Sequence, residues 1–181
     1  MDKSSIFLES QRFFLSKVSI VHVTKTYLEW LHDQDVNHFL ESGKTPSSID
    51  ELKSFVKENN SLLFLAIHDK ENNYHIGNIK IDSFNAIHRT AEYGIMIGDK
   101  SYWGKGVANE ISKIILEHCF NVLNIRKITL GVIGKNKKAL NLYEKLGFET
   151  EGILKNHVFV NGEYLNVYRM AIFQKLYIDK K

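Results

Sequence analysis

The chain has 181 residues, of which 44% are hydrophobic, 12% aromatic and 25% charged, and its formal net charge is +3. This length corresponds to one domain of roughly 150 residues, and the composition excludes a disordered chain, a collagen and a disulfide scaffold. Because the charge is small and the basic residues are dispersed, a small anionic ligand is favoured over a nucleic acid.

The cysteine content and the N-terminal sequence bear on the cellular location of the protein. The single cysteine, Cys119, has no partner for an intramolecular disulfide, which is typical of a reducing compartment. Residues 1–11 lack a basic stretch followed by an apolar run, and no window of about 18 residues is uninterruptedly apolar. We therefore expect a cytoplasmic protein with no membrane partner.

The first half of the chain carries short strand and helix patterns. A β-branched and aromatic run over 12–18 predicts an edge strand, and amphipathic patches at 27–31 and 36–40 predict two helices. A third helix is expected over 49–58, where Ser48 and Glu51 have the spacing of a capping box. Three strands in an antiparallel meander are then expected, at residues 62–67, 75–82 and 90–97.

In the second half the hydrophobic period changes from that of strands to that of helices. A helix of about four turns should begin beside Gly106, and a strand is expected at 127–133. A further helix at 137–146 should end at Gly147, and Asn161-Gly162 predicts a type I′ hairpin between the last strands. This order predicts an α+β (α/β mixed) fold.

One segment has the pattern of a phosphate-binding loop. A strand ends near Ile97, a turn containing Gly104 and Gly106 follows, and a helix begins at once. Such a turn directs unpaired N–H groups and the positive end of a helix dipole at one place, where phosphate oxygens bind well. An ordinary glycine turn has the same pattern. The segment lacks the Gly-Lys-Ser/Thr of a P-loop, and Asn109 replaces the third glycine of a dinucleotide fingerprint.

Two motifs together resemble one family. Trp103-Gly104-Lys105-Gly106-Val107-Ala108 resembles the Gln/Arg-x-x-Gly-x-Gly/Ala acetyl-CoA loop of the GNAT N-acetyltransferases, and Asn136-x-x-Ala139-x-x-Leu142-Tyr143-x-x-x-Gly147-Phe148 resembles their following helix motif. The resemblance covers residues 8–174, and it is closest to the branch with ribosomal-protein N-terminal, spermidine and amino-sugar acetyltransferases. The chain departs from the motifs at Trp103, usually Gln or Arg, and at Lys137, commonly proline.

The resemblance implies a fold, a domain and a co-substrate. We expect the GNAT fold, a central twisted and mostly antiparallel sheet with helices on both faces, as a single domain over 8–174 between short extensions, 1–7 and 175–181. Acetyl-CoA would be the co-substrate, without a metal. Its expected binding residues are Ile95, Ile97, Trp103, Gly104, Lys105, Gly106, Val107, Ala108, Asn136, Ala139 and Tyr143.

The resemblance also implies direct attack of an amine on the thioester carbonyl, without an acyl-enzyme. Tyr143 matches the tyrosine proposed as general acid for the coenzyme A sulfur, although it also lies on an apolar helix face, as a core tyrosine would. Glu92 matches an acidic position that acts on the amine through water, and its alternative is a solvated charge on a half-exposed strand. Asn136 is expected to cap its helix, to bind coenzyme A, or both.

Other candidate residues carry weaker signals. The eight histidines have no metal-ligand spacing. His88 could border the acceptor but fits a surface loop better, and Cys119, on an apolar helix stripe, fits the core better than a nucleophile. Trp30, with Tyr27 and Phe39, fits packing of the first helices better than an acceptor pocket.

The acceptor is expected to be a small primary amine, and the sequence offers several classes. Residues 27–42 look most like relatives that acetylate nucleotide-linked amino sugars, which is the interpretation we favour from sequence. Residues 87–164 are similar to the spermidine enzymes, so a polyamine is the alternative. Asn166 stands where that branch often has an acid. Carboxylates that could bind a polyamine are Asp33, Asp35, Glu41 and Glu51.

Two further functions stay open at this point: acetylation of a ribosomal-protein N-terminus, and a non-catalytic acyl-CoA-binding module. Retention of both Tyr143 and Glu92 argues against the module. The family resemblance is also compatible with a homodimer.

Overall fold

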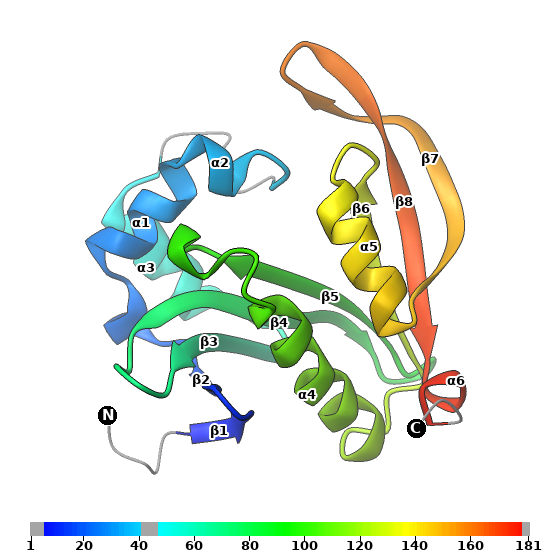
Figure 1. Cartoon of the computed structure of the whole chain (residues 1–181), viewed down its shortest axis with the longest axis horizontal. Coiled ribbons are helices and arrows are strands. Elements are labelled where there is room, and N and C mark those ends of the chain that lie inside the picture. The colour runs from blue at the N-terminus through cyan, green and yellow to red at the C-terminus, as the bar shows by residue number, and fades with distance from the viewer. Residues whose placement is uncertain (1–5, 41–46, 179–181) are drawn as a thin grey trace. The chain divides into compact units, whose positions relative to one another are not determined.

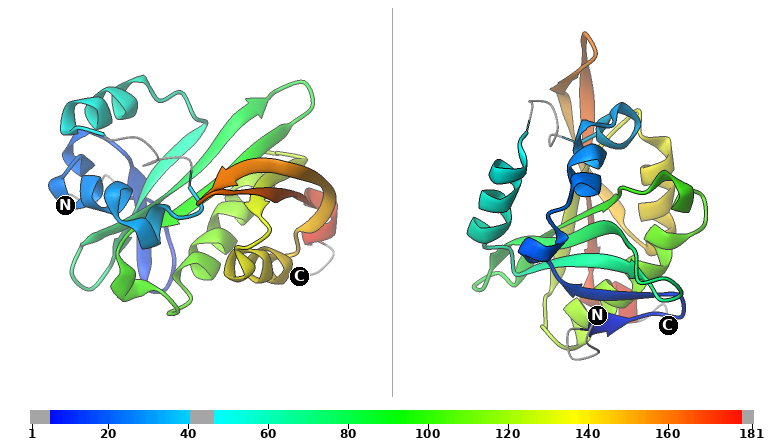
Figure 2. Two further views of the ribbon diagram at one scale, coloured as in Figure 1. Left: turned by 90° about the horizontal axis from the view of Figure 1, so that it is seen from above. Right: turned by 90° about the vertical axis from the view of Figure 1, so that its left-hand side faces the viewer.

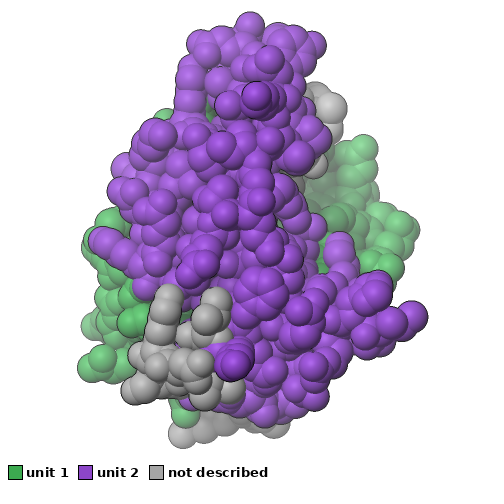
Figure 3. Space-filling view, turned by 90° about the vertical axis from the view of Figure 1, so that its right-hand side faces the viewer, with its two compact units in different colours: residues 1–82, 94–114 green, residues 83–93, 115–181 purple. Residues whose placement is uncertain are grey.

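The computed structural model describes residues 6–40 and 47–178, and it divides into two compact units. Unit 1 contains the described residues up to 82 together with 94–114, and unit 2 contains 83–93 together with those from 115 onward (Figure 3). Each unit is described by itself.

Unit 1 is built on antiparallel strands. These are β1 (Ile6–Glu9), β2 (Phe13–Lys17), β3 (Leu63–Asp69) and most of β4 (His75–Asn85), followed by the last part of β5 (Thr90–Ile97). β1 pairs with β2, β2 with β3 and β3 with β4, all antiparallel, and Figure 2 shows them side by side. The expectation of an edge strand at 12–18 was wrong, because β1 covers that edge. β1 has only four residues, three of them exposed, so it carries no alternating hydrophobic signal.

The helices of unit 1 follow the expected order. They are α1 (Lys25–His32), α2 (Gln34–Asn37) and α3 (Ile49–Glu58), with short 3₁₀ turns η2 (Ile20–His22) and η3 (Lys100–Tyr102). The expected capping box is confirmed: the N–H of Glu51 donates to Ser48 Oγ at 3.2 Å, and the N–H of Ser48 donates to Glu51 Oε2 at 2.7 Å.

Tyr27, Trp30 and Leu31 of α1 pack against Leu52 of α3 in a buried cluster. Trp30 also lies so close to Gly98 that a Cβ on that glycine would overlap its ring. Tyr27 and Trp30 are therefore core residues, as their helical spacing predicted.

Unit 2 combines one parallel pair with antiparallel pairs. β6 (Lys127–Ile133) pairs in parallel with the first part of β5, from Thr90↔Lys127 to Glu92↔Thr129. β8 (Glu163–Phe173) pairs antiparallel with β6 and with β7 (Glu149–Val160). Figure 1 shows β7 and β8 as a long hairpin, coloured orange to red. The turn at Asn161 and Gly162 has φ of 48° and 86°, as a type I′ turn requires.

The helices of unit 2 are α5 (Lys137–Leu146), α6 (Gln174–Ile178) and the second half of α4 (Val107–Asn121). Gly147 ends α5 with a φ of 95°, the left-handed cap expected from sequence. Cys119 is fully buried, and burial raises the pKa of its thiol to about 12, so it is a core residue and not a nucleophile.

Backbone hydrogen bonds join the strands in the order β1-β2-β3-β4-β5-β6-β8-β7. Among the registers given above, only β5 and β6 pair in parallel, and α4 connects these two strands. Two parallel neighbours need a crossover connection of this kind, because the chain must return to the same end of the sheet. The mixed α+β class with a mostly antiparallel sheet is confirmed. Among the described residues, no helix is both long and apolar enough to cross a membrane.

Candidate cofactor and active site

The predicted phosphate loop lies in unit 1, between the end of β5 and the start of α4. Gly104 and Gly106 have φ of 73° and 76°, in the left-handed region that glycine adopts without strain. Residues 103–106 are exposed, and α4 begins directly after them at Val107. The first N–H groups of α4 have no carbonyl of their own helix to bind. The loop can therefore present backbone donors to an anion.

Trp103, the departure from the family's loop motif, has a visible role. Its indole Nε1–H donates to the carbonyl oxygen of Ile97 at 2.8 Å, which ties the loop to the end of β5. Its side chain remains partly exposed. Ile95 and Ile97 are half-buried on β5, while Val107 is buried and Ala108 half-buried in the first turn of α4.

The predicted cofactor residues of unit 2 lie at the start of α5. Asn136 is the N-cap, because its Oδ1 accepts the N–H of Ala139 at 3.1 Å. The capping prediction is confirmed. Since the amide oxygen is used in the cap, a hydrogen bond from this side chain to a ligand would be donated by Nδ2.

Tyr143 is packed into the core of unit 2. Its ring lies 5.9 Å from that of Tyr93 and 5.7 Å from that of Phe148, centroid to centroid. Burial raises the pKa of the phenol to about 12. A phenol in this setting is protonated at neutral pH, which a proton donor requires, so the core position and the acid role are compatible.

Glu92 forms an ion pair that sequence analysis missed. Its Oε1 accepts a hydrogen bond from Arg169 Nη1 of β8 at 2.7 Å, and the two side chains are 40% and 35% exposed. Arg169 Nη2 also lies 3.4 Å from Thr129 Oγ1. Glu92 is therefore not a freely solvated charge. No local signal marks Arg169 as its partner, because the two residues are far apart in the sequence.

Glu92 and Tyr143 are on opposite faces of β5. Tyr93 points toward α5, where its ring contacts that of Tyr143. Successive side chains of a strand point to opposite faces, so Glu92 points away from α5. The two predicted catalytic residues thus lie in the same unit without direct contact.

The carboxylates considered for a polyamine do not form one open cluster. Lys100 Nζ lies 2.7 Å from Asp33 Oδ2 and 3.0 Å from Asp35 Oδ2, and its hydrogen bond lowers the pKa of Asp33. Glu51 serves the cap of α3, and Glu41 lies outside the described residues.

Two residues considered for the acceptor have backbone or turn roles. His88 is exposed in the turn before β5, and its backbone carbonyl oxygen accepts from Arg126 Nε at 3.3 Å. Asn166 Oδ1 accepts the N–H of Asn156 across the β7–β8 hairpin at 2.9 Å.

Three histidines that look dispersed in sequence meet in unit 1. His68 and His75 are paired residues in the β3–β4 register, and His22 joins them from η2. The ring centroids lie 5.3–5.5 Å apart. Within the described part of the chain, no group of three or more histidine, cysteine or acidic side chains has an arrangement that could hold a metal ion.

Comparison with known proteins places these features in a family. A family model described as an acetyltransferase (GNAT) domain matches residues 12–149. This chain belongs to the GNAT acetyltransferase family. The match contains the loop at 103–108 and all of α5, so the two motifs that carry the resemblance lie inside the GNAT domain.

Among its GNAT relatives are spermidine N(1)-acetyltransferases. The chain is 42% identical to the Escherichia coli K12 enzyme over 102 residues, 56% of this chain and 54% of the relative, so it spans about half the length of that protein. It is 37% identical to the Vibrio cholerae enzyme over 136 residues, 74% and 78% of the two chains.

A crystal structure of spermidine N-acetyltransferase from Vibrio cholerae in complex with CoA and spermine is similar in fold. The TM-score is 0.83 at 30% identity, covering 92% of this chain and 98% of the other.

Proposed function

We propose that this chain is an acetyl-CoA-dependent N-acetyltransferase whose acceptor is a polyamine of the spermidine class. The observation that carries the proposal is the likeness, over 92% of the chain, to an enzyme crystallised with CoA and spermine. Both curated relatives described above are named for spermidine. The polyamine alternative is therefore favoured over the amino sugar that sequence alone favoured.

In this proposal the residues of the two motifs bind acetyl-CoA. The exposed loop of unit 1, with its two left-handed glycines, would bind the pyrophosphate through backbone N–H groups. Ile95 and Ile97 would contact the pantetheine arm from β5. Asn136 of unit 2 would donate a hydrogen bond to the cofactor, with Ala139 beside it. Acetyl-CoA supplies the activated thioester when bound.

The chemistry that we propose is a direct transfer. The neutral amine attacks the thioester carbonyl carbon, a C–N bond forms, the C–S bond breaks, and coenzyme A leaves as a thiolate that takes a proton. Tyr143 is the proposed donor of that proton. The proton lost from the attacking nitrogen passes through water to Glu92. The proposal requires this relay, because Glu92 lies on the face of β5 away from the Tyr143 ring.

Arg169 gives the Glu92 carboxylate a defined orientation in this proposal. A guanidinium bonded to Oε1 restricts rotation of the carboxylate and leaves Oε2 to bind the relaying water. Lys100, held by Asp33 and Asp35, occupies the place of an ammonium group on that acidic pair. A polyamine that used these two carboxylates would have to displace it.

The experiment is an acetyl-transfer screen that measures thiol release with four acceptors: spermidine, spermine, a nucleotide-linked amino sugar and a peptide with a ribosomal-protein N-terminus. Fastest turnover with a polyamine is the expected result. Turnover of the amino sugar or of the peptide alone would replace the polyamine by that acceptor.

Acetyl-CoA should also raise the melting temperature of the free protein, because a ligand that binds only the folded state stabilises it. A stabilised protein without turnover of any acceptor would favour the non-catalytic module. No thermal shift at millimolar acetyl-CoA would refute the proposal. The homodimer and the cytoplasmic location stay predictions.

A further inference from the structure

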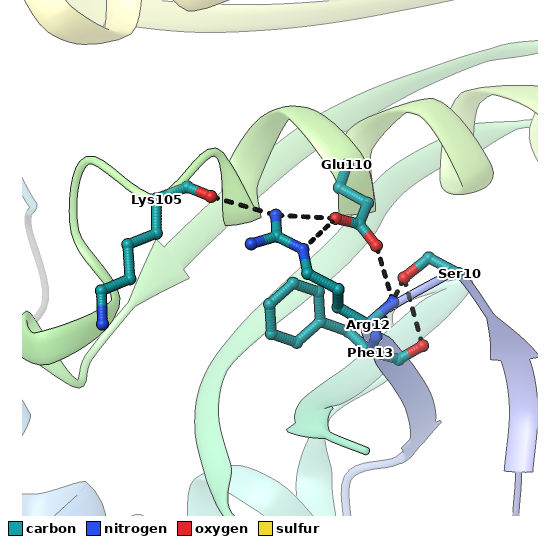
Figure 4. Close-up of polar contacts among 5 residues, drawn as sticks. All are labelled: Ser10, Arg12, Phe13, Lys105 and Glu110. Carbon is teal, nitrogen blue, oxygen red and sulfur yellow. Dashed lines mark hydrogen bonds and ion pairs between the residues drawn. The ribbon is translucent and has the colours of Figure 1, made fainter. Parts of the chain in front are cut away.

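Arg12 joins three parts of unit 1 that are distant in sequence. Its Nε donates to Glu110 Oε2 at 2.8 Å, and its backbone N–H donates to Glu110 Oε1 at 3.0 Å (Figure 4). Its Nη2 donates to the carbonyl oxygen of Lys105 at 3.0 Å. The residue before β2 is thus bonded both to the first turn of α4 and to the predicted phosphate loop.

The carbonyl that Arg12 binds is at the centre of the loop. Lys105 lies between Gly104 and Gly106, the two residues with left-handed φ. Glycines populate both signs of φ readily, so this turn has little conformational preference of its own. A hydrogen bond at its middle carbonyl therefore selects one conformation from many.

Planarity of the peptide bond makes this contact relevant to ligand binding. The carbonyl of Lys105 and the N–H of Gly106 belong to one trans peptide, in which they point in opposite directions. Because Arg12 holds the carbonyl on its own side, the N–H of Gly106 is turned to the other side. That N–H is one of the donors that the proposed function assigns to the pyrophosphate.

The ion pair with Arg12 offsets the negative charge of Glu110 near the predicted phosphate loop. A free carboxylate in the first turn of α4 would repel a nearby anion, whereas here it lies 2.7 Å from Arg12 Nη2. Burial alone would raise the pKa of Glu110, but hydrogen bonds from Arg12 and Ser10 outweigh it, and the pKa lies below its ordinary value. The carboxylate is therefore ionised and paired.

The Arg12 guanidinium also contacts a buried aromatic ring. The guanidinium lies 4.9 Å above the ring centroid of Phe13, which is 2% exposed in β2. The Arg12 and Glu110 side chains themselves are 47% and 21% exposed. Ion pairs this exposed add little to folding stability. The contact of Arg12 with Glu110 is therefore better explained by its effect on the conformation of the Gly104–Gly106 turn.

We propose that Arg12, oriented by Glu110, is a positioning residue that sets the Gly104–Gly106 turn for binding the pyrophosphate of acetyl-CoA. The inference rests on the proposed function. It assigns to Arg12 no contact with the reacting atoms. It concerns only the part of the cofactor that carries the phosphates.

Two acetyl donors that differ in the pyrophosphate test this role of Arg12. Acetyl-CoA and S-acetylpantetheine carry the same thioester, but only acetyl-CoA has the pyrophosphate. Arg12→Met should raise the KM for acetyl-CoA about tenfold or more, the ratio expected for loss of one charge-assisted hydrogen bond. The kcat at saturation and the kcat/KM for S-acetylpantetheine should stay unchanged.

Arg12→Lys should rescue only in part, because an ammonium cannot bond the carboxylate and the carbonyl with the same planar fork. Lys53→Met is the matched control, since Lys53 also forms an ion pair in unit 1, with Asp50 at 2.9 Å, and contacts neither Arg12 nor Glu110 in that pair. This control should leave both donors unaffected.

Three results would overturn the inference. Equal losses with both acetyl donors, accompanied by a lower melting temperature, would make Arg12 a stabilising residue only. If Arg12→Met binds acetyl-CoA as tightly as the wild-type chain does, the positioning role of Arg12 is refuted but the proposed function is not. A wild-type chain that does not bind acetyl-CoA would refute both.

Discussion

Acidification should destabilise the protein well above the pH at which most carboxylates titrate, because His22, His68 and His75 are packed together. His22 and His68 are 4% and 2% exposed. Burial lowers the pKa of His68 to about 4 and that of His75 to about 4, and it lowers the pKa of His22 as well.

The hydrogen bonds of this cluster require neutral rings. His22 Nδ1 accepts the N–H of Ser19 at 3.0 Å, so Nε2 carries the hydrogen and donates to Ser16 Oγ at 3.4 Å. The Ser16 hydroxyl then donates to His68 Nε2 at 3.0 Å. Protonation of His68 would place a hydrogen on Nε2 and break this last bond.

The direction and size of the effect follow from linkage. Well above pH 6.5 these three histidines are neutral in both states, and stability does not depend on their protonation. Between about pH 6.5 and 4 the unfolded chain binds protons that the folded chain does not, so stability falls as pH falls. At pH 5, proton binding by unfolded His68 and His75 should lower the free energy of unfolding by about 3 kcal/mol in total, after allowance for solvent screening.

Thermal unfolding between pH 7.5 and 5 measures this loss. For a chain of this size the melting temperature should fall by about 10 °C. Carboxylates whose pKa is lowered, such as Asp33 through its bond with Lys100, lose their contribution only below about pH 4. The histidine effect is therefore separate from acid denaturation of the ion pairs.

His75→Gln tests the assignment, because glutamine does not titrate and can still donate to Asn78 Oδ1, which His75 Nε2 contacts at 2.9 Å. In the His75→Gln variant the free energy of unfolding should fall less steeply with falling pH than in the wild type, by about 1.4 kcal/mol per pH unit. His88→Gln, at an exposed position, should keep the wild-type slope. Identical slopes in His75→Gln and wild type, or a melting temperature that is constant from pH 7.5 to 5, would refute the reasoning.

Three further variants test the site and the packing. Tyr143→Phe should lower kcat about 100-fold with little change in acetyl-CoA affinity, and an unchanged rate in steady-state assays would leave Tyr143 a core residue only. Glu92→Gln should reduce turnover most at low pH, and a pH–rate profile parallel to that of the wild type would exclude the base role. Gly98→Ala should destabilise by about 2 kcal/mol because its Cβ overlaps the Trp30 ring; a melting temperature equal to that of the wild type would contradict this packing.

Short-range signals in the sequence predicted most elements. The capping box of Ser48 and Glu51, the left-handed Gly147 and the Asn161-Gly162 turn each depend on residues within a few positions of one another. Their geometry is determined locally, so their prediction needed no knowledge of the fold. The motifs at 103–108 and 136–148 are local as well, and they were sufficient to indicate the family.

The contacts that define the site could not be predicted in this way. Arg12 with Glu110, and Glu92 with Arg169, join residues 98 and 77 positions apart. Such pairs arise only when strand order and register bring distant segments together, and many registers satisfy the same hydrophobic alternation. The sequence by itself therefore determined most of the elements, the turns named above and the family, but not the edge strand β1. The tertiary structure decided which charges meet: it paired Glu92 with Arg169 and the ionised Glu110 with Arg12 beside the loop, and it placed three histidines in one core.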